Sequence, residues 1–169
     1  MFRISHKKGV SLIEMLIYIA LLVMIFMVVL KTLLSFSSTY RTIAANRIIE
    51  ASAITSLERM TRDIRNATSI DAVNSTFGSN PGILSLITTQ NGVSTTTKFY
   101  VSSNTIQVDV NGTNIGPLTT SRVSVTSLIF TQLTGSTTNA VKIDMTLQGS
   151  NGNVTKTKIY HSTIVLKGS

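Results

Sequence analysis

Several residue types are scarce or missing in this chain of 169 residues. It has no cysteine and no tryptophan, and only two prolines. Without cysteine there can be no disulfide framework, no thiolate metal site and no cysteine nucleophile. Charged residues make up 13% of the chain, whereas a typical soluble domain has about 25%. This composition argues against an ordinary cytosolic enzyme, and also against a disordered chain, which would carry more charge.

Motifs of catalytic and cofactor sites are also missing. There is no GxSxG, P-loop or GxGxxG sequence, and two histidines, His6 and His161, cannot make a histidine-rich zinc site. We expect His161 to be a sheet-face residue, since nothing in the sequence pairs it with an acid and a nucleophile. Asp109 begins a stretch similar to a calcium loop, but Thr120 stands where the bidentate Glu would be needed, so a β-turn is expected. We therefore predict no enzymatic activity, no cofactor and no metal.

Acidic residues are few, seven against 15 basic ones, which gives a net charge of +8. Outside the first nine residues the surplus is spread thinly, which is a weak indication of nucleic-acid binding. In ERMTRDIRNA (58–67), Arg59, Arg62 and Arg65 recur every three residues. Acids lie among them, and Glu58 and Arg62 have the spacing of a favourable intrahelical pair. We interpret this segment as a solvated helix face, and nucleic acid is not an expected partner.

A single long apolar run follows the basic start. Residues 10–30 contain one strongly polar side chain, Glu14, and Lys31 ends the run. As a helix with about 1.5 Å per residue the run spans about 31 Å, the thickness of a bilayer core. A cleaved signal peptide would have a shorter apolar core, of about 7–15 residues. A plain membrane anchor leaves Glu14 unexplained, because a carboxylate at the centre of a span costs about 2.5–3.5 kcal/mol.

The segment KKGVSLIEMLIYIALL (7–22) resembles the processing signal of type IV prepilins. The family pattern is a short basic leader ending in Gly, then an apolar residue, then Glu at the fifth position of the mature chain. Lys7, Lys8, Gly9, Val10 and Glu14 occupy these places. The resemblance is specific over residues 1–35 and is a matter of general pattern beyond them.

This resemblance implies how the site residues act. A prepilin peptidase would cleave between Gly9 and Val10 and methylate the new amine of Val10. Lys7 and Lys8 would keep the leader in the cytoplasm, as the positive-inside rule requires. Glu14 would pair with the Val10 amine of a neighbouring subunit and fix the axial register. Pairing with the amine of its own chain is the alternative.

Partners and location follow from the same resemblance. The precursor would lie in the cytoplasmic (inner) membrane, with its leader inside and its head outside, in contact with lipid. It would then join an extracellular or periplasmic filament with other pilin or pseudopilin subunits, driven indirectly by a platform protein and an assembly ATPase. Two departures favour a minor pilin or a J-type minor pseudopilin: Lys31 stands where many major pilins have Pro, and the cysteines of their C-terminal disulfide loop are missing.

Two rival functions remain open at this point. One is a stationary membrane-anchored β domain that acts as a binding module. The other is a DNA-capturing pilin of a competence system. The sequence does not distinguish a pilus from a secretion pseudopilus.

The rest of the chain predicts an α+β, pilin-like fold. We expect a leader (1–9), a transmembrane or filament-core half of one long helix (10–34), its amphipathic half (35–67) and a β-rich head (68–169). The predicted apolar stripe of the second half is Ala44, Ile48, Ala51, Ile54, Leu57, Met60 and Ile64. About six strands in one mostly antiparallel sheet are expected at 83–90, 93–101, 104–110, 122–133, 139–148 and 154–166, with Asn-Gly turns after residues 90 and 110. Residues 68–82 are the expected flexible joint.

Overall fold

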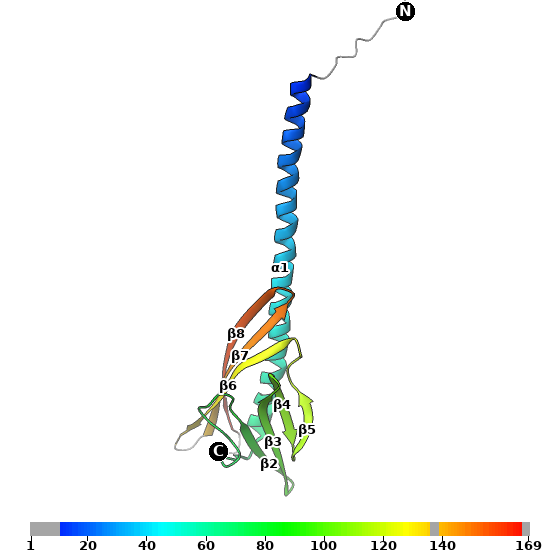
Figure 1. The fold of residues 1–169 in the computed structure, drawn as a ribbon. Coiled ribbons are helices and arrows are strands. Elements are labelled where there is room, and N and C mark those ends of the chain that lie inside the picture. The colour runs from blue at the N-terminus through cyan, green and yellow to red at the C-terminus, as the bar shows by residue number, and fades with distance from the viewer. Residues whose placement is uncertain (1–10, 136–138, 167–169) are drawn as a thin grey trace, which may run out of the picture. The chain divides into compact units, whose positions relative to one another are not determined.

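The computed structural model describes residues 11–135 and 139–166. Within these ranges one long helix is followed by eight strands, and all neighbouring strands pair antiparallel (Figure 1). An α+β fold with a long N-terminal apolar helix is therefore confirmed. The chain divides into two units, Met1–Tyr40 and Arg41–Ser169.

Helix α1 (Leu12–Asn66) contributes residues to both units. Neither Gly nor Pro occurs within it, and these are the two residues that most weaken a helix interior. The helix continues through Lys31, as the lack of Pro at that position predicted. The expected end at about Ala67 is confirmed within one residue, whereas the expected start at Val10 lies outside the described residues.

The first sheet of the Arg41–Ser169 unit is a five-stranded meander. Its strands are β1 (Ser69–Ile70), β2 (Leu84–Gln90), β3 (Val93–Ser102), β4 (Thr105–Val110) and β5 (Thr113–Pro117). Two of its hairpins turn at Asn91-Gly92 and Asn111-Gly112, where φ is 52°, 78°, 50° and 78° in chain order. Positive φ at both central residues is the reason that such turns favour Asn-Gly. Both predicted turns are confirmed.

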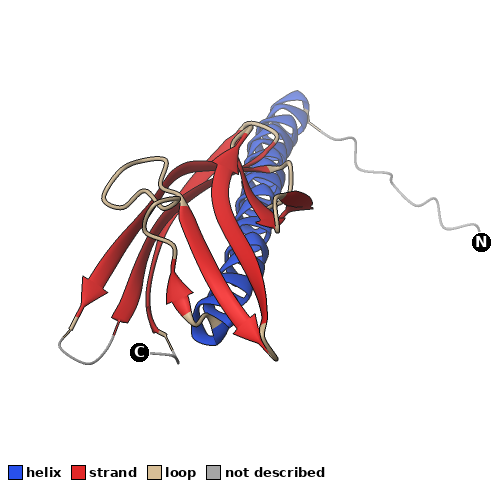
Figure 2. Cartoon of the chain, turned by 90° about the horizontal axis from the view of Figure 1, so that it is seen from below, coloured by secondary structure: helices blue, strands red, loops and turns tan. Residues whose placement is uncertain are grey.

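The second sheet has three long strands in the order β6-β7-β8. They are β6 (Val123–Thr134), β7 (Asn139–Asn151) and β8 (Val154–Val165). Figure 2 shows the long strands of both sheets beside the helix. The N–H of Val125 donates to the carbonyl of Asn104 (2.8 Å), which ties the second sheet to the turn between β3 and β4.

The prediction of about six strands in one sheet was wrong. The missed strands are β1, which has only two residues, and β5, which contains Gly and Pro and lacks an alternating apolar pattern. Periodicity cannot detect strands of this kind, because the period-2 signal requires four or more residues. The six longer strands lie close to their expected ranges.

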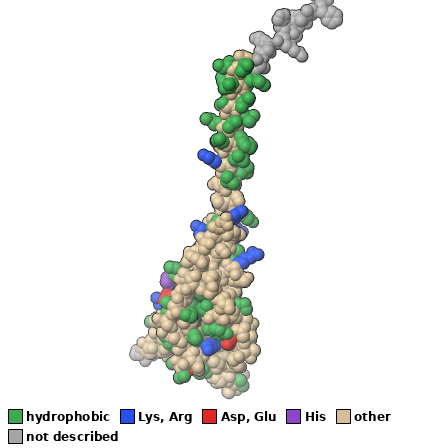
Figure 3. Space-filling model, in the orientation of Figure 1, with side chains coloured by type: hydrophobic (Ala, Val, Ile, Leu, Met, Phe, Trp, Pro, Cys, Tyr) green, Lys and Arg blue, Asp and Glu red, His purple; other side chains and the backbone are tan. Residues whose placement is uncertain are grey.

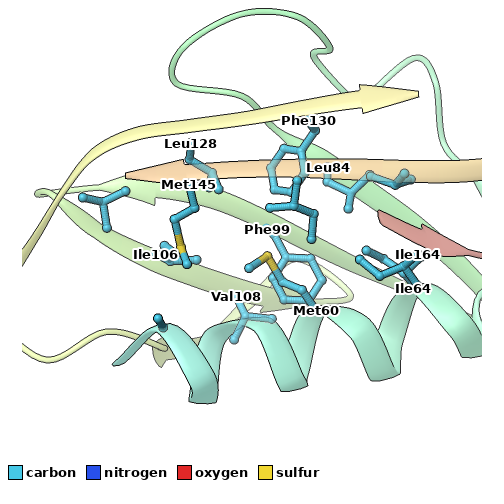
Figure 4. Packing of buried hydrophobic residues seen from close by; sticks show 14 of the residues in the cluster. Met60, Ile64, Leu84, Phe99, Ile106, Val108, Leu128, Phe130, Met145 and Ile164 are labelled. Carbon is cyan, nitrogen blue, oxygen red and sulfur yellow. The ribbon is translucent and has the colours of Figure 1, made fainter. Parts of the chain in front are cut away.

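The core of the Arg41–Ser169 unit lies between the helix and the inner faces of both sheets (Figure 4). Met60 and Ile64 of α1, Phe99 of β3 and Phe130 of β6 are fully buried in it, together with Met145 of β7. Alternate residues of β7 point inward, as predicted for the stretch from Val141 to Leu147. This burial supplies the main driving force for folding of the unit.

The helix face that enters this core differs from the predicted stripe. Met60 and Ile64 are buried as expected, but Ala51 and Ile54 are exposed and the other three predicted residues are only partly covered. The buried helix residues are Ala45, Ile49, Ser52, Ala53, Ser56, Met60 and Ile64. The buried face is rotated around the helix relative to the predicted apolar stripe, because small residues, two of them serines, face the sheet. Apolarity alone therefore selected the wrong face over residues 44–57.

Residues 68–82, the expected joint, are tied to the sheets. The Ser75 hydroxyl accepts a hydrogen bond from the Ser85 N–H (2.9 Å), and the Asn80 side-chain oxygen accepts one from the Leu128 N–H (3.1 Å). The N–H of Gly82 donates to the Leu128 carbonyl at 2.7 Å. Residues 78–82 therefore lie beside β6 and Ser75 is bonded to β2, so the segment is a hydrogen-bonded connection and not the flexible joint that was expected.

Candidate processing and assembly site

The proposed cleavage signal lies at the edge of the described structure. Lys7, Lys8, Gly9 and Val10 are outside the described residues, which begin at Ser11. The Ser11 carbonyl accepts the first backbone hydrogen bonds of α1, from the N–H groups of Glu14 (3.0 Å) and of residue 15 (3.1 Å). The helix therefore begins at Leu12, two residues after the residue that the predicted cleavage would make the N-terminus.

Glu14 lies in the first turn of α1 and is exposed to the surroundings. The Tyr18 hydroxyl, one turn later, donates a hydrogen bond to Glu14 Oε1 at 3.2 Å. A carboxylate in the first turn is also favoured by the partial positive charge of the helix N-terminus. Neither contact supplies a full opposite charge.

A cationic partner for Glu14 is missing along its own helix segment. Between Ser11 and Tyr40 the only basic side chain is Lys31. Lys31 lies 17 positions after Glu14, which is about 25 Å at the usual helical rise. A cation for Glu14 therefore has to come from the residues before Ser11 or from another molecule.

Tyr18 is a site residue that the sequence analysis missed. The four-residue spacing from Glu14 could have identified it, since such side chains are neighbours on a helix. Its hydroxyl holds one carboxylate oxygen and leaves Glu14 Oε2 without a described protein donor.

The helix around Glu14 is apolar on all sides. In the Met1–Tyr40 unit its large hydrophobic side chains are 43–84% exposed, and Figure 3 shows hydrophobic side chains along much of the described part of this unit. Soluble monomers rarely expose an apolar surface of this extent. The helix is long and apolar enough to cross a membrane, and none of its most apolar stretch is buried within the protein. Lipid, or other helices of the same kind, would satisfy this surface.

The outer face of the second sheet carries an ion-pair cluster. Asp144 of β7 lies 2.9 Å from Lys142 Nζ and 2.5 Å from His161 Nδ1 on β8. Hydrogen bonds from His161 and then from Lys142 hold the pKa of Asp144 below its ordinary value. His161 is on the sheet face as predicted, and it contacts the acid Asp144, a contact that the sequence analysis did not identify. Sequence reasoning missed this contact because Asp144 faces His161 only through the β7–β8 register.

Asp109 belongs to a hydrogen-bond network at a turn. Its Oδ1 accepts hydrogen bonds from the Tyr100 hydroxyl (3.1 Å) and from Asn114 Nδ2 (2.9 Å). The Asn111 side-chain oxygen accepts from the Thr96 N–H at 2.9 Å. These contacts form a β-turn network, as expected. Across the described residues, no group of three His, Cys, Asp or Glu side chains could hold a metal ion.

The arginine-bearing end of α1 is partly neutralised. Asp63 Oδ2 lies 2.7 Å from Arg59 Nε, and Asp63 Oδ1 lies 3.6 Å from Arg62 Nε. Within residues 11–135 and 139–166 no ion pair joins Glu58 to Arg62, so that predicted pair was wrong. The helix face formed by residues 58–67 nevertheless carries both acidic and basic side chains, as expected.

Comparison with known proteins gave no match to a family model, to a curated protein or to a solved structure.

Proposed function

We propose that this chain is a pilin-like subunit, of the minor pilin or minor pseudopilin type, that is processed after Gly9 and joins a filament. One observation carries the proposal. Glu14 is a lone acid, without a cationic partner along residues 11–40, in a helix that is otherwise apolar on every side. A carboxylate in such a place is unfavourable unless a partner neutralises it. The amine of Val10 created by cleavage is a cation four residues away in the sequence, and a neighbouring subunit would present the same group.

The proposed assembly follows from the exposed apolar surface. In the precursor, lipid contacts the side chains of residues 12–36. In the filament, the apolar helices of neighbouring subunits replace that lipid, because close packing of helices is the main attraction between apolar segments. Each Glu14 then faces a Val10 amine of another subunit, and the pair fixes the axial register, as single buried polar groups do in coiled coils. The β head remains outside this bundle and determines its neighbours.

The decisive experiment is the intact mass and N-terminal peptide of the protein from membranes that contain an active prepilin peptidase. We expect a chain that begins at Val10 and carries one added methyl group. A Gly9→Val variant should keep residues 1–9, because a side chain at this position hinders an extended fit in a narrow protease site. A wild-type chain that keeps Met1 to Gly9 would refute the proposal and favour a stationary anchor for a β domain.

A DNA-capturing role receives less support. Of Arg59, Arg62 and Arg65, the three arginines that could contact phosphate, the first two lie against Asp63. Salt-dependent DNA binding by the purified protein would nevertheless restore that function as a property of the same filament subunit.

A further inference from the structure

The packed layer between helix α1 and the first sheet opens into a polar cleft at one end. Phe99 and Val108 of the sheet fill this layer against Met60 of the helix (Figure 4). Toward the β2–β3 turn the same layer contains a cleft of about 250 Å³. The cleft is lined by Arg59, Asp63 and Asn66 of the helix and by Thr88, Gln90, Thr95, Thr97 and Val110 of the sheet. All of these residues belong to the Arg41–Ser169 unit, so the cleft lies within one compact part of the chain.

The strand register brings polar side chains to the floor of this cleft. Thr97 of β3 faces Leu86 of β2 on one side and Val110 of β4 on the other, and Thr95 faces Thr88. Leu86 is fully buried in the core, and side chains two positions apart on a strand share a face of the sheet. The threonines therefore lie on the core-facing side, where their hydroxyls replace the apolar side chains that fill the rest of the layer.

Three helix residues form the opposite wall. Arg59, Asp63 and Asn66 are spaced four and three residues apart, so they lie on one face of α1. Arg59 Nε donates a hydrogen bond to Asp63 Oδ2 at 2.7 Å, which orients both side chains and balances their charges. Along the described chain the two Nη groups of Arg59 and the side-chain amide of Asn66 have no protein hydrogen-bond partner. The wall therefore presents hydrogen-bond donors and acceptors with little net charge.

The hydroxyl groups on the floor also lack protein partners. Thr97 is only 8% exposed, yet within the part of the chain that the structure describes its hydroxyl has no protein hydrogen-bond partner. The same holds for the hydroxyls of Thr88 and Thr95. Buried polar groups are normally hydrogen-bonded, and leaving such a bond unmade is costly. A molecule bound in the cleft would supply the missing partners.

The chemistry of the lining favours a neutral ligand that is rich in hydroxyl groups. Threonine hydroxyls and the amides of Asn66 and Gln90 both donate and accept hydrogen bonds, as the hydroxyls of such a ligand do. The Arg59–Asp63 pair leaves little net charge to attract an ion, and one carboxylate is too few for a hard cation. Val110 is the one apolar side chain of the described lining, so an apolar ligand would be poorly matched.

We propose that this cleft binds one sugar ring. A sugar ring carries several hydroxyl groups on a compact frame, which matches the polar groups on both walls of the cleft. The cleft is smaller than the pockets of about 300–1,000 Å³ that hold drug-sized ligands, so a single ring fits and a longer saccharide would extend out of it. The proposal does not depend on processing after Gly9. It gives the β head a ligand of its own, whether the chain is a filament subunit or a stationary anchor.

The test uses the full chain in a detergent without a sugar headgroup and measures binding by saturation-transfer difference NMR. The probes are glucose, galactose, mannose and N-acetylglucosamine, together with the linear trisaccharides of glucose and N-acetylglucosamine. We expect at least one probe to bind with a Kd of about a few millimolar, as is usual for a small ligand with few polar contacts. Tighter binding of a trisaccharide than of its monosaccharide would identify a polysaccharide as the source of the ring, and equal or weaker binding would identify a free sugar.

Threonine variants locate the binding. Thr95→Val/Thr97→Val removes two hydroxyls at nearly constant volume and should weaken binding about tenfold or more. The matched control, Thr96→Val/Thr163→Val, makes the same change at two positions outside the cleft lining and should bind as the wild type does. Thr95→Ser/Thr97→Ser keeps both hydroxyls and should stay within about threefold of the wild type. This variant distinguishes a lost hydrogen bond from disturbed packing.

Three results would overturn the proposal. If none of the sugars binds, the cleft holds only water. Equal weakening by the cleft variant and its control would mean that the sugar binds elsewhere on the protein. A signal from triglycine and from no sugar would assign the cleft to a peptide chain instead. None of these results bears on processing after Gly9, which the intact mass of the chain tests separately.

Discussion

Gly149 of β7 faces Ile49 of α1 so closely that a Cβ at residue 149 would lie 2.6 Å from Ile49 Cγ1. The same Cβ would lie 3.4 Å from the carbonyl oxygen of Ala45. A strand usually disfavours Gly, because Gly loses more entropy on folding than other residues. Here the missing side chain allows the helix and the second sheet to pack in direct contact.

Substituting Gly149 should therefore destabilise the head. Gly149→Ala forces Ile49 or the strand to move, and overpacking of this kind costs about 1–3 kcal/mol. Thermal unfolding of the full chain in detergent should show the loss as a lower Tm. Ser150→Ala, at the exposed neighbouring position, should leave the Tm nearly unchanged. An unchanged Tm for Gly149→Ala would mean that the helix–sheet contact is looser than described.

The rotated helix stripe gives a second prediction. Ala53 is fully buried, whereas Ala51 is exposed, although the apolar pattern placed Ala51 in the core. Ala53→Asp would bury a charge without a partner and should destabilise the unit by more than about 3 kcal/mol. Ala51→Asp should stay within about 0.5 kcal/mol of wild type. Chemical denaturation of both variants distinguishes the two faces, and the reverse order of stabilities would restore the predicted stripe.

Elements with a clear pattern in the sequence could be predicted, whereas elements too short or too irregular to show a pattern could not. The apolar run and the strands of six or more residues carry patterns that repeat within one element. The turns at residues 91 and 111 are marked by the specific pair Asn-Gly. The two-residue β1 and the Gly- and Pro-containing β5 carry neither signal. The helix face near Ala53 was mispredicted because small residues, Ser52, Ala53 and Ser56, are buried there, and small or polar residues give no apolar signal in the sequence.

Some contacts of the candidate sites could likewise be predicted from the sequence, and others could not. Glu14 could be identified because one acid in an apolar run is visible in the sequence. Its contact with Tyr18 follows a helical spacing and could have been found. The Asp144–His161 contact depends on strand register across a turn, so only the fold reveals it.

Asp144 should make stability depend on pH in the acidic range. Its folded-state pKa is depressed below the ordinary value of 3.8, first by the hydrogen bond from His161. The ionised form is therefore favoured in the folded state, and its contribution is present above pH 3.8 and lost as the pH falls through the lower folded pKa. The Tm difference between wild type and Asp144→Asn should be largest near neutral pH and should shrink below about pH 4.

The control for this measurement is Glu58→Gln, which removes an exposed acid outside the cluster. It should not reproduce the acid-range change in the Tm difference. A Tm difference for Asp144→Asn that stays constant down to the lowest pH at which the protein folds would show that the His161 and Lys142 contacts do not stabilise the carboxylate.

Glu14 provides the sharpest prediction about assembly. Glu14→Ala should insert into the membrane and lose residues 1–9 at a normal rate, because the cleaved bond lies four residues before it in the sequence. It should enter sheared filaments poorly, since the Val10 amine of a neighbouring subunit would then remain buried without a partner, and breaking such a pair costs about 3–5 kcal/mol. Tyr18→Phe keeps the charge and removes only the hydroxyl that donates to Glu14 Oε1, so its incorporation should fall far less. Incorporation of Glu14→Ala at the wild-type level would refute the role of Glu14 in fixing the axial register. It would not bear on cleavage after Gly9, which the intact mass of the mature chain tests separately.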